Sequence, residues 1–455
     1  MKKNIINSIF GLAVASLMLT ACSSADDAVT SSPTAPATDD AAINFGAYMN
    51  RTTTRGGMVG ELTTAALQGS AEGFGVLAYY TDNQPYNPNA VPNFMYNEQI
   101  TYNAGDWTYS PLKYWPNEFG TTASSTSYDR LSFFAYAPYA EIDPVTGYAT
   151  AANYGIVGMT RSAESGNPKV RYSASFKPNE QVDLCWAEPL SDMIKPAIDN
   201  KVTFTFKHAL SSLNIQIDAL FDELAQNAGA LDSYTRIWVR SVTFEGLAVK
   251  GELNLNNSEH TPEWHDLYSN GLLSGEPVTI YDGRRDGREG YAAMDNEKPV
   301  AINPVLVQSA GYTIGVSNNA LVITAPDATH GVTTTAVNLF DGAANATDPI
   351  YVIPTGEPLR ITIVYDVETF DPNLTSSFLS DTETNGSSIE NVITKVVEDT
   401  NGPVTLVAGK KYDISLHLGM TSAKFDVNKV WGWDEDENGD PQTPVEGNTD
   451  LPANN

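Results

Sequence analysis

The sequence predicts an all-β protein of two tandem antiparallel β-sandwich domains with few short helices. Apolar and polar residues alternate with a period of two from residue 43 onward, and turn-rich stretches separate the short apolar runs. No regular alternation of strands with helices is visible, which argues against a parallel sheet. A sandwich of seven strands takes about 100 residues. The strand-bearing region runs from about residue 41 to 433, so two sandwiches with long loops fit it.

The composition excludes several classes of partner. The chain has 455 residues with 26 Lys and Arg against 55 Asp and Glu, a net charge of −29. So acidic a chain repels the phosphates of nucleic acids, and it repels anionic lipid surfaces unless a covalent group holds it there. At 42% hydrophobic and 10% aromatic residues, it still has ample apolar material for large cores.

Residues 1–21 are predicted to be a signal peptide. Lys2 and Lys3 precede a short apolar run at 9–19, which is too short to span a membrane. The run leads into Leu-Thr-Ala before Cys22, which resembles a bacterial lipoprotein signal in which Cys22 becomes the lipidated first residue. The alternative is an ordinary signal peptide with an incidental cysteine.

Residues 22–40 are predicted to be a flexible tether, since Ser, Thr, Ala, Pro and Asp dominate and leave little to bury. The acidic stretch at 23–27 is similar to the surface-export signal of Bacteroidetes lipoproteins. The alternative is a merely solvated tether.

The strands follow in order. Ile43, Phe45, Ala47 and Met49 alternate on one face of the first. Further alternating or apolar runs predict strands at 74–80, 131–138, 202–208, 213–217, 237–255, 359–367 and 412–420. At Leu210 the alternation of apolar and polar residues shifts by one position, as it does at a β-bulge or where a strand crosses a sandwich edge. The one helical pattern lies around 218–226.

A domain boundary is expected at 254–262, where a strand has ended and Asn256-Asn257-Ser258 forms a turn. The two sandwiches would then span 41–257 and 258–433. Residues 434–455 are acidic, rich in Pro and Asn and nearly free of apolar side chains, which predicts a disordered tail.

No constellation of residues predicts catalysis, a cofactor or a metal ion. With Cys22 lipidated, Cys185 has no partner for a disulfide and is expected to be a buried, inert thiol. His260 and His265 lie near Glu263, but Pro262 precludes a helical two-histidine face. The stretch 282–289 does not keep the spacing of a calcium loop. His208 and His417 are expected to be structural, and no enzyme motif is present.

Five segments, taken in order, carry a family resemblance. They are 74–80 (FGVLAYY), 107–116 (WTYSPLKYWP), 131–138 (LSFFAYAP), 202–213 (VTFTFKHALSSL) and 407–416 (VAGKKYDISL). Together with the lipoprotein signal they resemble the Bacteroidetes fimbrillin-like proteins, the subunits of type V pili. The resemblance implies two transthyretin-like β-sandwich domains, export as a lipoprotein and assembly into cell-surface fimbriae.

The resemblance also implies assembly by strand exchange. In the family, an Arg-specific protease releases an N-terminal strand, and a C-terminal segment of a neighbouring subunit fills the groove. Here the removable strand would be Ile43 to Met49, and the processing sites would be Arg51 and Arg55. The alternative is that this strand stays in place as an ordinary edge strand.

The donor segment would be 423–433, with Phe425, Val427 and Val430 facing the groove. The alternative is that this segment is the domain's own last strand. In a simple donor subunit the chain would end with the donor strand, whereas here an acidic tail follows residue 433.

The predicted location is the outer membrane and cell surface, in a fimbrium. The predicted partners are other fimbrial subunits through strand exchange, the outer membrane through lipid on Cys22, and a host protein or glycan. The second hypothesis is a glycan-binding surface lipoprotein that does not polymerise. The aromatic cluster Trp107, Tyr109, Tyr114 and Trp115 could stack on sugars if it is exposed. The alternative, which we favour, is that the cluster belongs to the core and edge of a sandwich.

Overall fold

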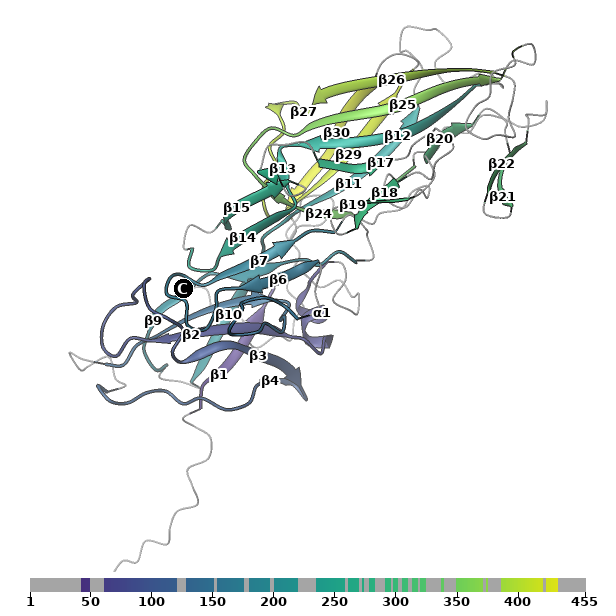
Figure 1. The fold of residues 1–455 in the computed structure, drawn as a ribbon. Helices are drawn as coiled ribbons and strands as arrows, with labels where there is room; N and C mark the ends of the chain where they lie inside the picture. The colour runs from purple at the N-terminus through teal and green to yellow at the C-terminus, as the bar shows by residue number, and fades with distance from the viewer. Residues whose placement is uncertain are drawn as a thin grey trace, which may run out of the picture. The chain divides into compact units, whose positions relative to one another are not determined.

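A computed structural model of the protein describes a large part of the compact unit Ala41–Asn455. The described residues are 42–49, 61–120, 128–150, 154–175, 180–196, 200–219, 235–257, 261–269, 272–273, 278–282, 291–295, 298–301, 305–309, 313–317, 320–324, 337–338, 349–370, 374, 386–419 and 423–432. They form strands with one short helix, so the all-β prediction is confirmed (Figure 1).

The N-terminal part of the unit is an eight-stranded sheet. Its order is β2 (Phe74–Tyr80), β3 (Met95–Asn103), β4 (Asp106–Thr108), β1 (Asn44–Tyr48), β10 (Lys201–His208), β8 (Cys185–Ala187), β5 (Leu131–Ala137) and β9 (Leu190–Met193). Because β2 also pairs with β5, seven of these strands form a closed circuit of backbone pairing. β1 lies inside that circuit and not at a sheet edge.

Two buried apolar clusters lie on opposite faces of β2 and β5. Phe74 and Val76 belong to the cluster that also holds the apolar side chains of β1, whereas Leu77 and Tyr79 belong to the other. Successive side chains of a strand point to opposite faces. Burial on both faces explains why β2 and β5 are almost continuously apolar in sequence.

The helix of the described residues is α1 (Thr64–Gly69). Thr63 caps it, because its hydroxyl accepts a hydrogen bond from Ala66 N at 3.0 Å. Sequence periodicity predicted a helix at 218–226 instead. Residues 218 and 219 belong to β11, and the rest of that stretch lies outside the described residues.

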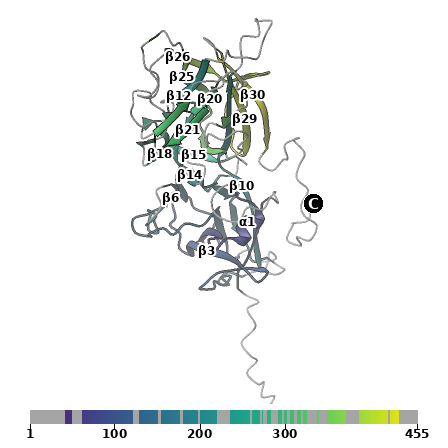
Figure 2. The same cartoon turned by 90° about the vertical axis from the view of Figure 1, so that its right-hand side faces the viewer.

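Two further sheets face each other in the C-terminal part. The first has the order β13 (Leu247–Ala248), β24 (Ile350–Pro354), β11 (Ser211–Ala219), β29 (Lys410–Leu418) and β30 (Ala423–Gly432), with β23 (Val337–Asn338) also on β11. The second has β19 (Lys298–Ala301), β18 (Tyr291–Asp295), β17 (Val278–Asp282), β12 (Thr235–Glu245), β25 (Arg360–Phe370) and β26 (Gly386–Val396), with β20 (Val305–Ser309) also on β12. Figure 2 shows β12 and β25 on one side and β29 and β30 on the other.

Three smaller sheets complete the described structure. A five-stranded sheet joins β16 (Leu272–Leu273), β15 (Glu263–Ser269), β14 (Lys250–Asn254), β7 (Lys169–Ser173) and β6 (Gly155–Met159). Two pairs join β21 (Thr313–Ser317) to β22 (Ala320–Thr324) and β27 (Glu398–Asp399) to β28 (Gly402–Pro403). The helix in the described ranges is too short to cross a membrane.

The phase shift predicted at Leu210 marks a change of sheet. β10 ends at His208 in the first sheet, and β11 begins at Ser211 in the six-stranded sheet. The stretch 254–262 connects β14 to β15, which pair within one sheet. The predicted division at residues 257 and 258 stays a prediction.

Candidate functional site

The candidate functional site is the position of β1 between β4 and β10, called here the β1 slot. β1 pairs in parallel with β10, from Asn44 opposite Lys201 to Tyr48 opposite Thr205. On its other side Phe45 lies opposite Trp107 of β4 in antiparallel register. Both backbone edges of β1 are therefore used inside its own chain.

Every second side chain of β1 is buried in the slot. Ile43, Phe45, Ala47 and Met49, which the sequence placed on one face, are all buried, with at most 3% exposure. Asn44 between them is exposed. This alternation gives the slot a row of apolar positions at two-residue spacing.

Phe45 is the largest side chain that β1 inserts. Its ring lies edge-on to Tyr109, with 5.2 Å between centroids, and edge-on to Phe133 at 6.1 Å. It also stacks on Phe204 of β10 at 6.0 Å. Such aromatic pairs add to the free energy gained from apolar burial.

Gly46 sits on the opposite face of β1, where an added Cβ atom would press on the side chains of Lys201 and Thr203. A Cβ atom added there would lie 2.8 Å from Lys201 Cε and 3.0 Å from Thr203 Oγ1. Phe45 and Ala47 are buried in the slot, and between them Gly46 leaves space for the Lys201 side chain.

Backbone and hydroxyl groups fix both ends of β1. At the start, Ile43 N donates to Lys113 O at 2.9 Å, and the Tyr109 hydroxyl donates to Ile43 O at 2.9 Å. At the end, Met49 N donates to Thr64 Oγ1 at 2.8 Å, and that hydroxyl donates back to Met49 O at 2.7 Å. Burial raises the pKa of Tyr109 to about 12, so the hydroxyl remains a donor at neutral pH.

This arrangement suits strand complementation, because β1 supplies backbone pairing and apolar side chains to the same slot. Without β1, the facing edges of β4 and β10 would present unpaired backbone groups beside a row of empty apolar positions. Any strand with matching two-residue alternation could use both, since main-chain hydrogen bonds supply affinity and alternate side chains fill the pockets.

The predicted donor segment is ordered within its own chain. It forms β30, which pairs antiparallel with β29 along its whole length and ends the six-stranded sheet of the described residues. Phe425, Val427 and Val430 lie opposite buried residues of β29. A β-bulge between Val427 and Lys429 adds one residue to β30, so Val430 returns to the same face as Phe425 and Val427. Exposure rises along β30 from 8% at Phe425 to 42% at Val430. Its role as a donor stays a prediction.

Three predicted site residues lie outside the described part of the chain. They are Cys22 and the two processing arginines, Arg51 and Arg55. Lipidation and cleavage therefore stay predictions. Glu61 is the first described residue after these arginines. Its Oε2 atom forms an ion pair with Lys411 Nζ at 2.8 Å.

The aromatic cluster that the sequence offered for sugar stacking is largely core. Trp107 and Trp115 are 8% and 7% exposed, so their indole faces are covered, while Tyr114 is 50% exposed. The glycan-binding alternative is not favoured. Of the histidine-rich stretch at 260–266, the structure describes an exposed pair of His265 Nε2 and Glu263 Oε1 at 2.9 Å.

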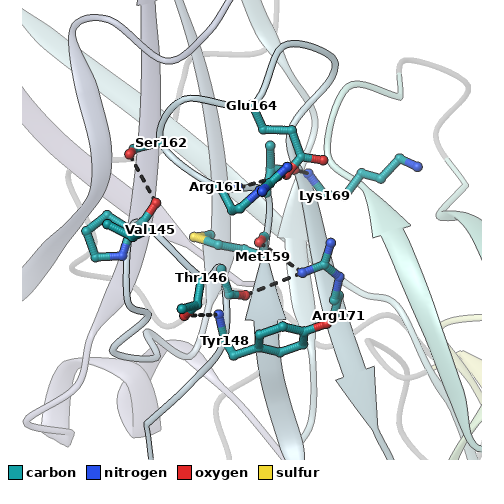
Figure 3. Close-up of polar contacts among 12 residues, drawn as sticks. Val145, Thr146, Tyr148, Met159, Arg161, Ser162, Glu164, Lys169 and Arg171 are labelled. Atoms are coloured by element: carbon teal, nitrogen blue, oxygen red, sulfur yellow. Dashed lines mark hydrogen bonds and ion pairs between the residues drawn. The ribbon is translucent and has the colours of Figure 1, made fainter.

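A polar cluster ties β6 and β7 to the preceding loop (Figure 3). Arg171 lies over the ring of Tyr148, with 5.3 Å from Cζ to the centroid, and donates to Gly147 O at 3.5 Å. Its Nε also donates to Glu252 Oε1 of β14 at 2.7 Å, and Lys169 bonds the second oxygen at 3.3 Å. The basic groups are paired inside the cluster, which gives it a structural role.

Sequence reasoning missed two features near the site. No sequence pattern predicted the role of Thr64, because its hydrogen bonds to Met49 form only in the folded chain. Asp183, Cys185 and His208 meet in the interior, all below 5% exposed, with His208 Nδ1 2.8 Å from Asp183 Oδ2 and 3.4 Å from Cys185 Sγ. The two-residue spacing of Asp183 and Cys185 was the available signal, but it does not reveal the histidine.

Comparison with known proteins agrees with this architecture. Residues 62–280, just under half of the chain, match the family model described as fimbrillin-like. The fimbrium subunit Fim1C of Phocaeicola vulgatus is 24% identical over 393 residues, covering 84% of this chain and 86% of the relative. The predicted family resemblance is confirmed. The crystal structure of a fimbrial protein from Bacteroides vulgatus has the same fold, with a TM-score of 0.50, 20% identity, and coverage of 86% of this chain and 99% of that one.

Proposed function

We propose that this chain, fimbrillin-like over residues 62–280, is a subunit of a cell-surface fimbrium that joins its neighbours by exchanging a β-strand. The observation that carries the proposal is the burial of a short N-terminal strand, β1, inside a closed circuit of strands. A relative that covers most of the chain is itself a fimbrium subunit, which supports the assignment.

Export follows the lipoprotein route in this proposal. The apolar leader ending at Cys22 supports lipidation of that thiol and delivery to the outer membrane. Covalent lipid would also reconcile membrane attachment with a net charge of −29, which anionic headgroups would otherwise repel.

Assembly then replaces β1 with a strand of a neighbouring subunit. Arg51 and Arg55 follow β1 directly, so cleavage at either would separate β1 from the domain that begins near residue 61. The vacated slot exposes the edges of β4 and β10, which a donor strand would satisfy.

The donor in this proposal is β30. Phe425 and Val427 keep the two-residue spacing of Phe45 and Ala47, so their side chains match the alternation of the slot. β30 lies at the end of its sheet and is paired on one edge within the described residues, which favours its release over that of an interior strand.

Mass spectrometry of the chain isolated from the cell surface tests the proposal. We expect a mature N-terminus directly after Arg51 or Arg55 and subunit ladders that resist SDS. A chain that retains acylated Cys22 and runs only as a monomer would contradict strand exchange at this slot. The variant Arg51→Lys/Arg55→Lys should abolish the ladders, whereas Arg161→Lys, at an exposed arginine outside this region, should leave them unchanged.

A further inference from the structure

The interior cluster of Asp183, Cys185 and His208 has the composition and spacing of a metal site. Their ligand atoms, a carboxylate oxygen, Sγ and an imidazole nitrogen, all lie within 4.8 Å of one another. Asp183 Oδ2 and Cys185 Sγ both point to the same nitrogen, His208 Nδ1, at 2.8 and 3.4 Å. His208 Nδ1 is therefore the shared neighbour of the other two ligand atoms.

The carboxylate of Asp183 adds an independent observation. Asp183 is 1% exposed, and its Oδ1 has no hydrogen-bond partner among the described residues. A buried carboxylate with one unsatisfied oxygen is costly unless a positive charge lies beside it.

We propose that Asp183, Cys185 and His208 bind one zinc ion. Zinc takes thiolate, imidazole and carboxylate ligands in tetrahedral geometry at about 2.0 to 2.3 Å. Here Cys185 Sγ, His208 Nδ1 and one carboxylate oxygen of Asp183 would supply three ligand atoms, and a water molecule would supply the fourth. On binding, the ion would displace two protons to solvent, the one between His208 Nδ1 and Asp183 Oδ2 and the thiol proton of Cys185, while His208 keeps the proton on Nε2.

Charge balance favours a divalent ion at this position. One carboxylate and one thiolate carry two negative charges, and a neutral imidazole adds none, so the occupied site is electrically neutral. Neutrality removes the main cost of burying ionised groups in an apolar interior. The surroundings also fit, since Leu62 N donates to Asp183 Oδ2 at 2.9 Å and would orient the carboxylate from outside the ligand shell.

The ion would act as a structural staple. Its ligands come from β8, from the residue two positions before β8, and from the last residue of β10. Through Leu62 N it would also hold the segment that leads into α1. It would thus fix the end of β10, the strand that forms one wall of the β1 slot. This inference concerns the folded chain alone and does not depend on strand exchange.

Refolding the full chain with metal tests the inference, because a buried site is filled as the protein folds. Cys22→Ser serves as the background, so that Cys185 is the remaining thiol. With cobalt as the probe, we expect one equivalent bound, with a thiolate-to-cobalt charge-transfer band and the visible bands of a tetrahedral ion. With zinc, we expect a Tm several degrees higher than in chelator.

Two variants distinguish the site from adventitious binding. Cys185→Ser should lose the charge-transfer band and the zinc-dependent rise in Tm, whereas His265→Gln, at the exposed His265–Glu263 pair, should keep both. Equal Tm values of Cys185→Ser and its parent in chelator would show that the variant folds. Asp183→Asn gives a second test of ligand loss if Cys185→Ser does not fold. Refolded parent chain that takes up no stoichiometric metal, or Cys185→Ser that binds as its parent does, overturns the inference.

Discussion

The hydroxyl of Thr64 bonds both backbone groups of Met49, accepting from its N–H at 2.8 Å and donating to its carbonyl at 2.7 Å. Met49 ends the buried alternation of β1, and Thr64 is the first residue of α1. The sequence between them contains Arg51 and Arg55. A cut at either arginine would therefore leave β1 attached through Thr64 and through its pairing with β4 and β10. Cleavage alone would therefore not release the strand, and release would need a further step.

Thr64→Val removes both bonds with little change of shape. We expect the free energy of unfolding of the uncut chain to fall by about 1–2 kcal/mol, because two backbone groups lose their partner. In a chain cut after Arg55, the N-terminal fragment should dissociate roughly tenfold faster, since about 1.4 kcal/mol corresponds to a factor of ten. Urea unfolding and fragment release by gel filtration measure the two effects.

A matched control is Thr362→Val, which removes a hydroxyl that bonds Thr394 at 2.8 Å on an exposed sheet face. It should change stability by less than about 0.5 kcal/mol and leave fragment release unchanged. Equal release rates for Thr64→Val and the parent chain would show that Thr64 does not retain β1.

Phe45→Ala tests how far β1 stabilises the uncut chain. Phe45 is 2% exposed and contacts the rings of Tyr109, Phe133 and Phe204. We expect a loss of about 3–5 kcal/mol in urea unfolding, as for other buried phenylalanines. Val430→Ala, at an apolar side chain that is 42% exposed, should cost less than about 1 kcal/mol. Similar losses for the two variants would argue against a well-packed slot.

Tyr109→Phe removes the hydroxyl that donates to Ile43 O, and the cost should depend on pH. We expect a loss of about 1 kcal/mol at pH 7. Burial raises the pKa of Tyr109 from 10.0 to about 12, so its contribution is complete below pH 10 and is lost as the pH rises through 12. The difference in unfolding free energy between parent and variant should be constant from pH 6 to 9 and shrink above pH 10. A difference that is already lost at pH 8 would refute this assignment.

Glu252→Gln tests the polar cluster between β7 and β14. Burial alone would raise the pKa of Glu252, but the hydrogen bonds and charges of Arg171 and Lys169 outweigh it and hold the pKa below its usual value. The contribution of Glu252 is thus present at neutral pH and is lost as the pH falls through the lowered pKa.

We expect Glu252→Gln to cost about 1 kcal/mol at pH 7 and much less at pH 3, measured by urea unfolding at both values. The matched control is Glu164→Gln, whose carboxylate pairs with the exposed Arg161. It should cost less than about 0.5 kcal/mol at either pH. A cost for Glu252→Gln that is the same at pH 3 and pH 7 would exclude the ion pair as its cause.

Much of the fold could be predicted because local alternation determines which face of a strand is buried. The run from Val202 to His208 forms β10 as expected, and the shift of phase at Leu210 marks the passage to the next sheet. The helical pattern at 218–226 begins inside β11, and its residues from 220 onward lie outside the described residues. The helix α1 gave no such pattern, because it depends on a cap at Thr63.

The placement of β1 could not be read from the sequence. Its apolar face was evident from Ile43 to Met49, but its partner β10 begins more than 150 residues later, and the two pair in parallel. Such pairing is set by the closed circuit of strands, which no local pattern encodes. The bonds of Thr64 and the meeting of Asp183 with His208 are likewise products of tertiary structure.

A reversible covalent lock offers the most direct test of strand exchange. Tyr48 of β1 and Thr205 of β10 lie opposite each other in register, so Tyr48→Cys/Thr205→Cys places two cysteines at a separation that a disulfide spans. The lock holds β1 in the slot even after cleavage. Thr362→Cys/Thr394→Cys, opposite each other on β25 and β26, introduces a matched disulfide away from the slot.

The decisive measurement is the formation of SDS-resistant ladders by these two variants with and without a reductant. If subunits exchange strands at the β1 slot, the oxidised Tyr48–Thr205 lock abolishes the ladders, reduction restores them, and the Thr362–Thr394 disulfide leaves them intact. Ladders that form normally while the Tyr48–Thr205 disulfide is shown to be closed would contradict strand exchange at the β1 slot.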